Sequence, residues 1–310
     1  MDSPGIVATG VRRSFGDVHA VRDVTLEARA GAVTGLVGPN GSGKTTLLLM
    51  LASLLAPDAG EIRIGGVDPI SDPAAARAAV GWMPDALGAW PSLTARETLV
   101  MTARLYGIGR DDAAAGAARL LDEVGLGPLA DRPARVFSRG QKQRLGLARA
   151  LVHDPRVLLL DEPASGLDPQ ARIELRTLLR RLAAEGRTVL ISSHVLSELE
   201  EVVDDAVFLV EGATVSSERV AAAATRQRTW RIRLADRDAR AAVVPIAQTL
   251  GLDAALIPID RRDVLVAFVT DNDAASALAA LIAAGLPVAE FAAATGILEH
   301  TFLDLEGGRS

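Results

Sequence analysis

The chain has 310 residues, which is more than one hydrophobic core usually holds, so two domains are expected. The composition, 49% hydrophobic and 23% charged, is that of a soluble globular protein, and the net charge of −6 argues against a nucleic-acid partner, because phosphate binding needs a basic excess. Cysteine is absent, which excludes disulfides and thiolate metal sites and suits a cytoplasmic protein.

The sequence offers no targeting or membrane-spanning signal. The N-terminus lacks the basic stretch and apolar run of a signal peptide, and no segment contains about 20 strongly apolar residues in succession. We therefore expect any membrane role to come through a partner.

Two β-strands are predicted at the start of the chain, at residues 6–11 and 18–26, with a turn at 14–17 between them. Phe15 lies in this turn, between Ser14 and Gly16. A phenylalanine in such a turn is less typical of a core than of a residue that stacks on something else.

A glycine-rich loop follows the apolar run 33–37 and precedes the apolar run 47–51. It completes the pattern G-x-x-x-x-G-K-[ST] with Gly38, Pro39, Asn40, Gly41, Ser42, Gly43, Lys44, Thr45 and Thr46. Backbone N–H groups of such a loop turn inward on a polyphosphate, and the helix that begins at the lysine directs its positive dipole end at the same anion. Lys44 is expected to reach the outer phosphates and Thr45 to place its hydroxyl on Mg²⁺. The loop predicts a nucleoside triphosphate with Mg²⁺ as the ligand.

The following segments predict an α/β core with an inserted helical part. A turn at 57–60, a strand at 61–64 and a buried strand at 80–85 precede a mainly helical stretch from 87 to about 149. The consecutive apolar residues 157–160 indicate a strand covered on both faces, and a helix at 169–184, a strand at 188–192 and a helix ending near 201 follow. This alternation predicts a doubly wound parallel sheet.

Two acidic residues, Asp161 and Glu162, end the strand at 157–160. Because side chains alternate along a strand, one carboxylate can hold the water shell of Mg²⁺ while the other faces an attacking water. Upstream, Ser138 and Gly140 precede a helix rich in long side chains, a pattern that alone indicates only an N-cap with a basic first turn.

A composition shift after Val215 indicates a second domain. Its predicted elements are strands at 229–234, 255–259, 264–269 and 288–292, with helices at 239–250 and 273–284 between them. The order βαββαβ is the ferredoxin-like arrangement. A last amphipathic helix is predicted at 298–305.

Taken together, these motifs resemble the ATP-binding cassette, the motor subunit of ABC transporters, from residue 6 to about 215. In the family's order they are the phosphate loop at 38–46, Asp85 after the middle strand, the signature at 138–141, Asp161 with Glu162, the loop at 165–168, and His194. Phe15 matches the aromatic residue that stacks on adenine. The resemblance implies a cassette over residues 1–220, with an N-terminal antiparallel β subdomain and a helical subdomain at about 87–150, and a ferredoxin-like accessory domain at 221–310.

The resemblance also implies a mechanism. Two cassettes pair head to tail around two MgATP, so that each ATP is clamped between the phosphate loop of one chain and the signature of the other, here Ser138, Arg139, Gly140 and Gln141. Glu162 is expected to polarise the attacking water, and His194 to contact the γ-phosphate or orient that water. Asp168 is expected to communicate across the dimer, and Thr45, Asp85 and Asp161 to serve Mg²⁺. His19, His153 and His300 are expected to be structural hydrogen-bonding residues.

Two residues depart from the family pattern. Asp85 stands where the family usually has glutamine, so the coupling of nucleotide to a membrane partner is expected to differ, and Arg139 stands where the commonest signature has glycine. The second domain and the ending at 298–305 look like the tail of ATPases that serve ABC-2-type exporters, including drug-resistance and antibiotic-export systems.

The sequence thus predicts an ATPase subunit that pairs with a second copy or a different cassette and drives a separate membrane permease, for export. It would be cytoplasmic and attached peripherally to the inner face of the cell membrane through that permease. One alternative is a soluble ABC-type ATPase acting on ribosomes or DNA, which the single cassette, the missing heptads and the negative charge disfavour. A P-loop kinase is the other alternative, but it would need an acceptor site and has no use for a signature motif.

Overall fold

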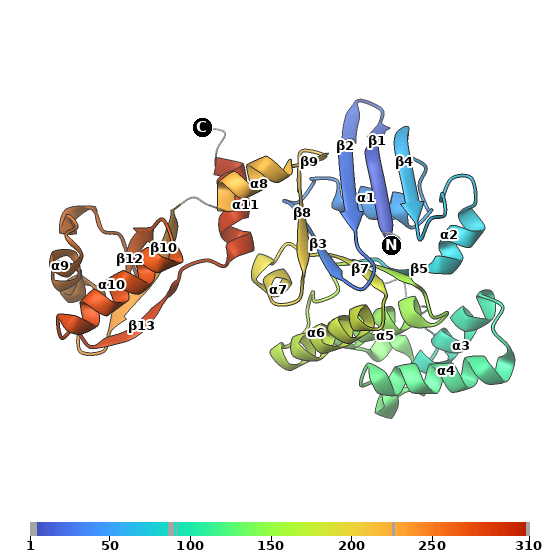
Figure 1. Cartoon of the computed structure of the whole chain (residues 1–310). Helices are drawn as coiled ribbons and strands as arrows, with labels where there is room; N and C mark the ends of the chain where they lie inside the picture. The colour runs from blue at the N-terminus through green and yellow to red at the C-terminus, as the bar shows by residue number, and fades with distance from the viewer. Residues whose placement is uncertain (1–4, 86–89, 91, 225–226, 308–310) are drawn as a thin grey trace. The chain divides into compact units, whose positions relative to one another are not determined.

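The structure is a computed structural model that describes residues 5–85, 90, 92–224 and 227–307. The chain divides into two compact units, Met1–Val215 and Ser216–Ser310 (Figure 1), whereas the predicted boundary lay between residues 220 and 221. Each unit is described by itself.

The first unit is built on a nine-stranded mixed sheet in the order β4-β1-β2-β9-β8-β3-β7-β6-β5. Strands β5, β6, β7, β3 and β8 pair in parallel, whereas β1 pairs antiparallel with both β2 and β4. The strands are β1 (Ile6–Phe15), β2 (Val18–Ala28), β3 (Val33–Val37), β4 (Ala59–Ile64), β5 (Val80–Met83), β6 (Val157–Asp161), β7 (Thr188–Ser192), β8 (Asp205–Val210) and β9 (Ala213–Thr214).

Helices of the first unit connect these strands. They are α1 (Lys44–Leu51), α2 (Pro73–Ala79), α3 (Ala95–Leu105), α4 (Arg110–Glu123), α5 (Arg139–Leu151), α6 (Pro169–Ala184) and α7 (Leu196–Glu200), with short 3₁₀ turns at Gly127–Leu129 and Ala134–Val136. Within the described ranges, no helix combines the length and the apolar character needed to cross a membrane.

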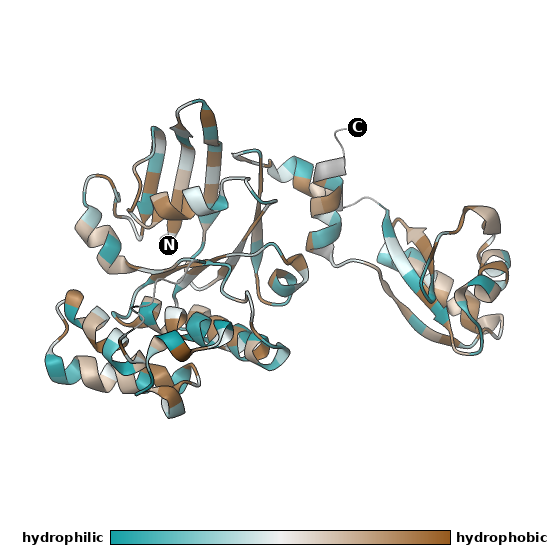
Figure 2. Cartoon of the chain, turned by 180° about the vertical axis from the view of Figure 1, so that it is seen from behind, coloured by the Kyte–Doolittle hydropathy of each residue, from teal (hydrophilic) through white to brown (hydrophobic). Residues whose placement is uncertain are grey.

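The two parts of the sheet differ in burial as well as in strand direction. Every residue of β3, β6 and β7 is buried, as expected for strands of a parallel sheet covered on both faces. The peripheral strand β1 alternates between buried and accessible positions, and Figure 2 shows hydrophobic and hydrophilic bands along β1, β2 and β4. The predicted parallel core with an antiparallel N-terminal part is confirmed.

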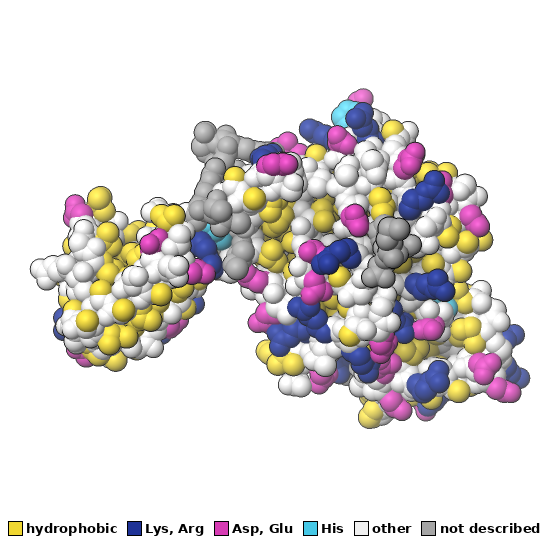
Figure 3. Space-filling view, in the orientation of Figure 1, with side chains coloured by type: hydrophobic (Ala, Val, Ile, Leu, Met, Phe, Trp, Pro, Cys, Tyr) yellow, Lys and Arg dark blue, Asp and Glu magenta, His cyan; other side chains and the backbone are white. Residues whose placement is uncertain are grey.

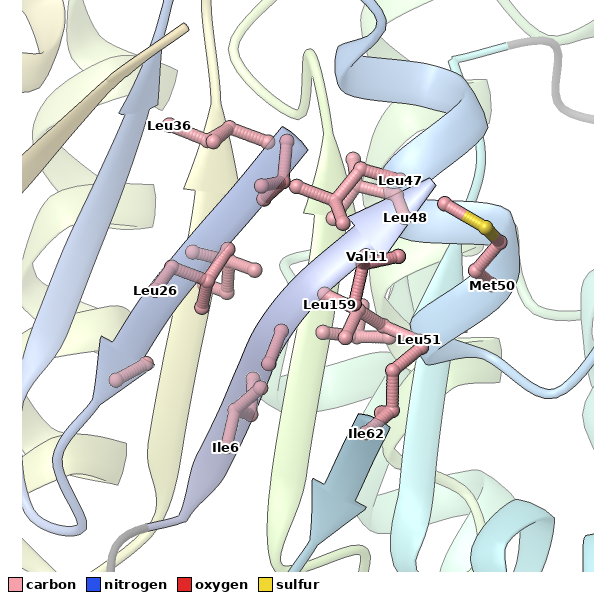
Figure 4. Packing of buried hydrophobic residues seen from close by; sticks show 14 of the residues in the cluster. Ile6, Val11, Leu26, Leu36, Leu47, Leu48, Met50, Leu51, Ile62 and Leu159 are labelled. Carbon is pink, nitrogen blue, oxygen red and sulfur yellow. The ribbon is translucent and has the colours of Figure 1, made fainter. Parts of the chain in front are cut away.

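Helix α1 joins the two parts of the sheet through one core. Its leucines Leu47, Leu48 and Leu51 are fully buried, and they pack with apolar residues of β1, β2, β4 and β6 (Figure 4). Because α1 begins at Lys44, this packing also fixes the position of the phosphate loop. Burying a leucine contributes roughly 1.5–3 kcal/mol, so these three leucines anchor the helix that follows the loop.

The helices α3, α4 and α5 share a second core, which is centred on Leu99, Leu121 and Leu145. Two of them begin with a capping box: Thr94 with Glu97 at α3, and Ser138 with Gln141 at α5. These reciprocal hydrogen bonds satisfy helix N–H groups that would otherwise lack partners.

The second unit contains a four-stranded antiparallel sheet in the order β11-β12-β10-β13, with helices α9 and α10. Its elements are α8 (Ser217–Ala224), β10 (Arg228–Leu234), α9 (Ala239–Leu250), a 3₁₀ turn (Ala254–Leu256), β11 (Ile259–Asp260), β12 (Asp263–Phe268), α10 (Asp271–Ala283), β13 (Val288–Ala293) and α11 (Ile297–Gly307). This βαββαβ order confirms the predicted ferredoxin-like arrangement.

One predicted strand of the second unit, 255–259, is wrong over most of its length. The Asp253 side chain accepts a hydrogen bond from the Ala255 backbone N–H at 2.9 Å and starts the 3₁₀ turn. Only Ile259 and Asp260 pair with β12. The local Asp turn therefore prevails over the apolar pattern.

Candidate nucleotide-binding site

Four functional segments meet where parallel strands of the first unit end. The phosphate loop follows β3, Asp85 lies just after β5, Glu162 follows β6, and His194 lies just after β7. In open α/β sheets, ligands bind at the carboxyl ends of the strands. The site is therefore a consequence of the strand order.

A cleft of about 410 Å³ opens at this edge. Its volume lies in the range of small-molecule sites. It is lined by Val18, His19, Ala20, Asn40, Gly41, Gly43, Lys44, Thr45, Thr46, Asp85, Asp161 and Glu162.

Two glycines of the loop are required by close backbone approach. Gly43 has φ 98°, and a Cβ there would lie 2.4 Å from the Ala20 carbonyl oxygen. At Gly38 a Cβ would lie 2.4 Å from the Leu209 carbonyl oxygen. The loop thus runs against both β2 and β8 with no room for a side chain at these two positions.

Lys44 is held inside the loop. Its Nζ donates to the carbonyl oxygens of Gly38, at 2.7 Å, and Pro39, at 3.0 Å, and the residue is only 8% exposed. Burial lowers the pKa of Lys44, and the neighbouring carboxylates of Glu162 and Asp161 oppose that shift. A partly desolvated ammonium group at a helix N-terminus fits a polyphosphate, whose charge would replace the missing solvation.

Asp161 is buried and uses both of its carboxylate oxygens. Thr45 Oγ1 donates to Oδ2 at 2.9 Å, and Ser192 Oγ donates to Oδ1 at 2.5 Å. A hydroxyl next to a carboxylate suits Mg²⁺, which is usually held by one or two protein oxygens together with water and phosphate oxygens. No cluster of three His, Cys, Asp or Glu side chains able to hold a metal occurs among the described residues.

Glu162 has a left-handed backbone, with φ 53°. Such a conformation costs a non-glycine residue on the order of 1–3 kcal/mol and persists only when its surroundings hold it. Ser192 accepts hydrogen bonds from the Glu162 N–H through its carbonyl oxygen and its Oγ, each at 3.2 Å. The Glu162 carbonyl oxygen accepts from Gln143 Nε2 and from the Ser165 N–H, each at 3.1 Å.

His194 is hydrogen-bonded to Glu162, with 2.8 Å between Nδ1 and Oε2. The histidine side chain is 55% exposed, whereas that of Glu162 is 15% exposed. The imidazole of His194 therefore lies on the solvent side of Glu162, whose carboxylate lines the cleft.

The signature segment lies outside the lining of this cleft. Ser138 caps α5 and is exposed, and Arg139 Nη2 donates to Ser165 Oγ at 2.5 Å. Asp168 is the exposed N-cap of α6 and accepts from the Ala171 N–H. The structure thus joins the signature to the loop at 165–168, but Ser138, Arg139, Gly140, Gln141, Asp168 and His194 do not line the cleft.

Phe15 is the last residue of β1, and Gly16 and Asp17 form the turn. The predicted turn at 14–17 therefore began two residues too early, and Phe15 belongs to the strand. The ring is 48% exposed, and its cross-strand partner Val18 lines the cleft, although Phe15 itself does not.

Sequence reasoning missed Ser192 and Gln143. Ser192 is a hydroxyl residue at the end of an apolar strand, two residues before His194, and Gln143 is a polar residue on the buried side of α5. The hydroxyl that follows the apolar run 189–191 was a usable signal for Ser192, whereas the local pattern of α5 gave none for Gln143. His19, expected to be structural, does hydrogen-bond Ser14 Oγ, at 2.8 Å, but it also lines the cleft. His153 also makes the kind of hydrogen bond expected of a structural residue. Its Nε2 lies 3.0 Å from the Val80 carbonyl oxygen, within normal hydrogen-bond range.

The fold and the cleft define a P-loop nucleotide-binding protein of the cassette type. A family model described as "ABC transporter" matches residues 21–165. The chain is 37% identical over 215 residues to the Bacillus subtilis ABC transporter ATP-binding protein NatA, covering 68% of this chain and 87% of NatA. It is 42% identical to the Nod factor export ATP-binding protein I of Burkholderia orbicola, covering 66% and 68%.

A third relative is longer. The chain is 43% identical over 203 residues to the Escherichia coli probable multidrug ABC transporter ATP-binding protein YbhF, but the match spans only 35% of that relative's length. Among solved structures, an ATP binding subunit of an ABC transporter has a TM-score of 0.64 at 26% identity, covering 70% of this chain and 92% of that one. The dimeric bacterial ABC transporter cassette MJ0796 has a TM-score of 0.63 at 25% identity, covering 68% and 97%. The chain belongs to the ABC transporter family.

Proposed function

We propose that this subunit hydrolyses MgATP in the cleft at the ends of β3, β5, β6 and β7, pairs with a second cassette around two MgATP, and drives a separate membrane permease in the export direction. The observation that carries the proposal is the strained, well-held Glu162, which lines the same cleft as Lys44 and is hydrogen-bonded to His194. On this proposal the subunit works at the inner face of the membrane, attached through the permease.

The phosphate loop and three oxygen-bearing residues would hold the substrate and its metal. Lys44 and the N–H groups at the start of α1 would bind the phosphates, while Thr45, Asp161 and Asp85 would face Mg²⁺ directly or through water. Bound Mg²⁺ neutralises charge on phosphate oxygens. Asp85 is exposed and lines the cleft, which supports a water-mediated role for its short side chain.

Glu162 would accept the proton of, or polarise, the attacking water. Its hydrogen bond to His194 Nδ1 orients the carboxylate, and the backbone contacts from Ser192 and Gln143 keep the residue in its left-handed conformation. A positioned carboxylate within reach of the substrate is what general-base catalysis requires.

A second cassette would complete the site. The signature residues do not line their own chain's cleft, which supports a contact with the γ-phosphate of an ATP bound to another chain. The N-terminus of α5, where Ser138 and Gly140 lie, is an anion-binding end of a helix. The similarity to the dimeric MJ0796 cassette supports this arrangement.

Hydrolysis is tested with two variants and a control. Lys44→Ala should lose nucleotide binding and turnover, whereas Glu162→Gln should bind ATP but not release phosphate. Glu185→Gln changes an exposed glutamate at the end of α6 and should keep full turnover. Undiminished phosphate release by either site variant, measured on purified protein, would overturn the assignment.

An apolar surface near the end of α3 supports a protein partner. Met101, Leu105 and Tyr106 are 42%, 73% and 43% exposed, and Trp90 is 39% exposed. Tyr106 stacks on His153 and Trp90 lies under the Arg149 guanidinium, so both rings are fixed in place. Clustered exposed apolar side chains are typical of interaction sites. The proposed partner is the permease.

The permease proposal is tested by co-purification from membranes. The intact chain should recover a multispanning membrane protein, and Leu105→Glu should lose it while keeping basal ATP hydrolysis. Recovery of ribosomes or DNA would instead support the soluble alternative. That alternative is disfavoured by the net charge of −6 and by the interspersed acidic and basic side chains on the face of the first unit in Figure 3.

A further inference from the structure

We infer that Arg13, held by Asp58, fixes the Phe15 ring in the pose that stacks on the nucleotide base. The inference rests on the proposed function, in which Phe15 contacts adenine. The carrying observation is that the Arg13 Cζ lies 4.8 Å from the centroid of the Phe15 ring. This distance is within the range of a cation–π contact.

Strand geometry brings the two side chains together. Arg13 and Phe15 are two residues apart on β1, so their side chains leave the same face of the strand. The Arg13 side chain is only 25% exposed, and partial desolvation strengthens its attraction to the ring.

Asp58 anchors this end of β1 from the turn before β4. Its Oδ1 accepts from Arg13 Nη1 at 2.7 Å, and its Oδ2 accepts from the Ser14 N–H at 2.7 Å. Its own N–H donates to the Arg12 carbonyl oxygen at 2.8 Å. One carboxylate therefore fixes both the guanidinium and the backbone that leads to Phe15.

Phe15 needs such an anchor because it is 48% exposed and belongs to none of the buried clusters formed by the described residues. A free ring would lose rotamer freedom when a base stacks on it, and this loss would weaken binding. With the guanidinium on one face, the ring is already oriented and its opposite face is left for a flat ligand. Arg13 is thus a positioning residue for the base.

The experiment measures dissociation constants for MgATP in the Glu162→Gln background, where hydrolysis does not interfere. Arg13→Ala and Asp58→Asn should each weaken MgATP binding by roughly two- to fivefold, the size of a partly exposed cation–π contact. Arg12→Ala is the matched control, because Arg12 is the exposed neighbour on the same strand, and its affinity should be unchanged. In the hydrolysing protein, Arg13→Ala should raise KM and leave kcat unaltered.

Two further binding measurements distinguish positioning of the Phe15 ring from a direct effect of the Arg13 charge on the phosphates. If Arg13 acts through Phe15, then adding Arg13→Ala to Phe15→Ala should weaken binding no further. Inorganic tripolyphosphate, which has no base, should bind Arg13→Ala and the parent equally well. Weaker tripolyphosphate binding, or independent losses in the double variant, would mean that Arg13 acts on the phosphates and would overturn the inference.

Failure of the inference and failure of the proposed function give different results. If Phe15→Ala weakens binding but Arg13→Ala and Asp58→Asn do not, the inference falls and the base-stacking proposal stands. If Phe15→Ala has no effect, both fall, while loss of binding in Lys44→Ala still identifies the phosphate site. An unfolding midpoint for Asp58→Asn equal to that of Arg12→Ala shows that the fold is intact.

Discussion

Gln143→Leu should slow ATP hydrolysis without unfolding the protein. The substitution removes the hydrogen bond from Nε2 to the Glu162 carbonyl oxygen, which contributes about 1 kcal/mol. It also removes the buried Gln143 Oε1, which has no hydrogen-bond partner among the described residues. Burying such an unpaired oxygen costs about 1–3 kcal/mol. Because the two effects oppose each other, the free energy of unfolding should change by no more than about 1–2 kcal/mol.

These opposing effects cancel in the free energy of unfolding, but they do not cancel in the rate of hydrolysis. Losing about 1 kcal/mol of restraint on the left-handed Glu162 peptide lets other conformations compete, and this corresponds to roughly a fivefold fall in the active population. We expect kcat for phosphate release to fall by about this factor, with little change in KM because Lys44 and Thr45 are untouched. Gln248→Leu, on the exposed side of α9, is the matched control. A folded Gln143→Leu variant whose kcat equals that of the control would refute the reasoning.

Three other predictions concern local geometry. Gly43→Ala should lower the free energy of unfolding by about 2 kcal/mol or more and abolish nucleotide binding. Gly186→Ala, at φ 95° with open space around it, should lower it only by the strain of the left-handed backbone. Equal losses of unfolding free energy in the two variants would contradict the clash with Ala20. Ser138→Ala and Thr94→Ala each remove a capping box and should each cost about 1 kcal/mol, but only Ser138→Ala should reduce phosphate release. Burial lowers the pKa of His153, so the folded state binds fewer protons than the unfolded state. The free energy of unfolding should therefore rise with pH between the lowered pKa and 6.5. Denaturation curves taken across this interval should show a flatter rise for His153→Phe.

The parts of the site that the sequence predicted are those encoded locally. The phosphate loop is a property of nine consecutive residues, and the unbroken apolar run before Asp161 requires a strand buried on both faces. Both features depend on consecutive residues and not on distant parts of the chain, so periodicity and motif spacing were sufficient to predict them.

The contacts that hold the catalytic residues are non-local, and this is why they were not foreseen. Ser192 reaches Asp161 across 31 residues, and Gln143 reaches Glu162 across 19. Nothing in the local pattern of α5 distinguishes a glutamine that faces β6 from one that faces solvent. The false strand at 255–259 has a local cause instead, because the Asp253 side chain two residues before Ala255 starts a turn within an otherwise apolar pattern.

In the proposed mechanism a second cassette completes each ATP site, so the two chains should associate only when MgATP is bound. The Glu162→Gln chain, of 32.3 kDa, should double in mass by light scattering when MgATP is added, because ATP is bound and not consumed. Adding Ser138→Arg to this chain should abolish the dimer while ATP still binds. If the mass stays at 32.3 kDa with ATP bound, or if the Ser138→Arg chain dimerises equally well, the shared site is contradicted.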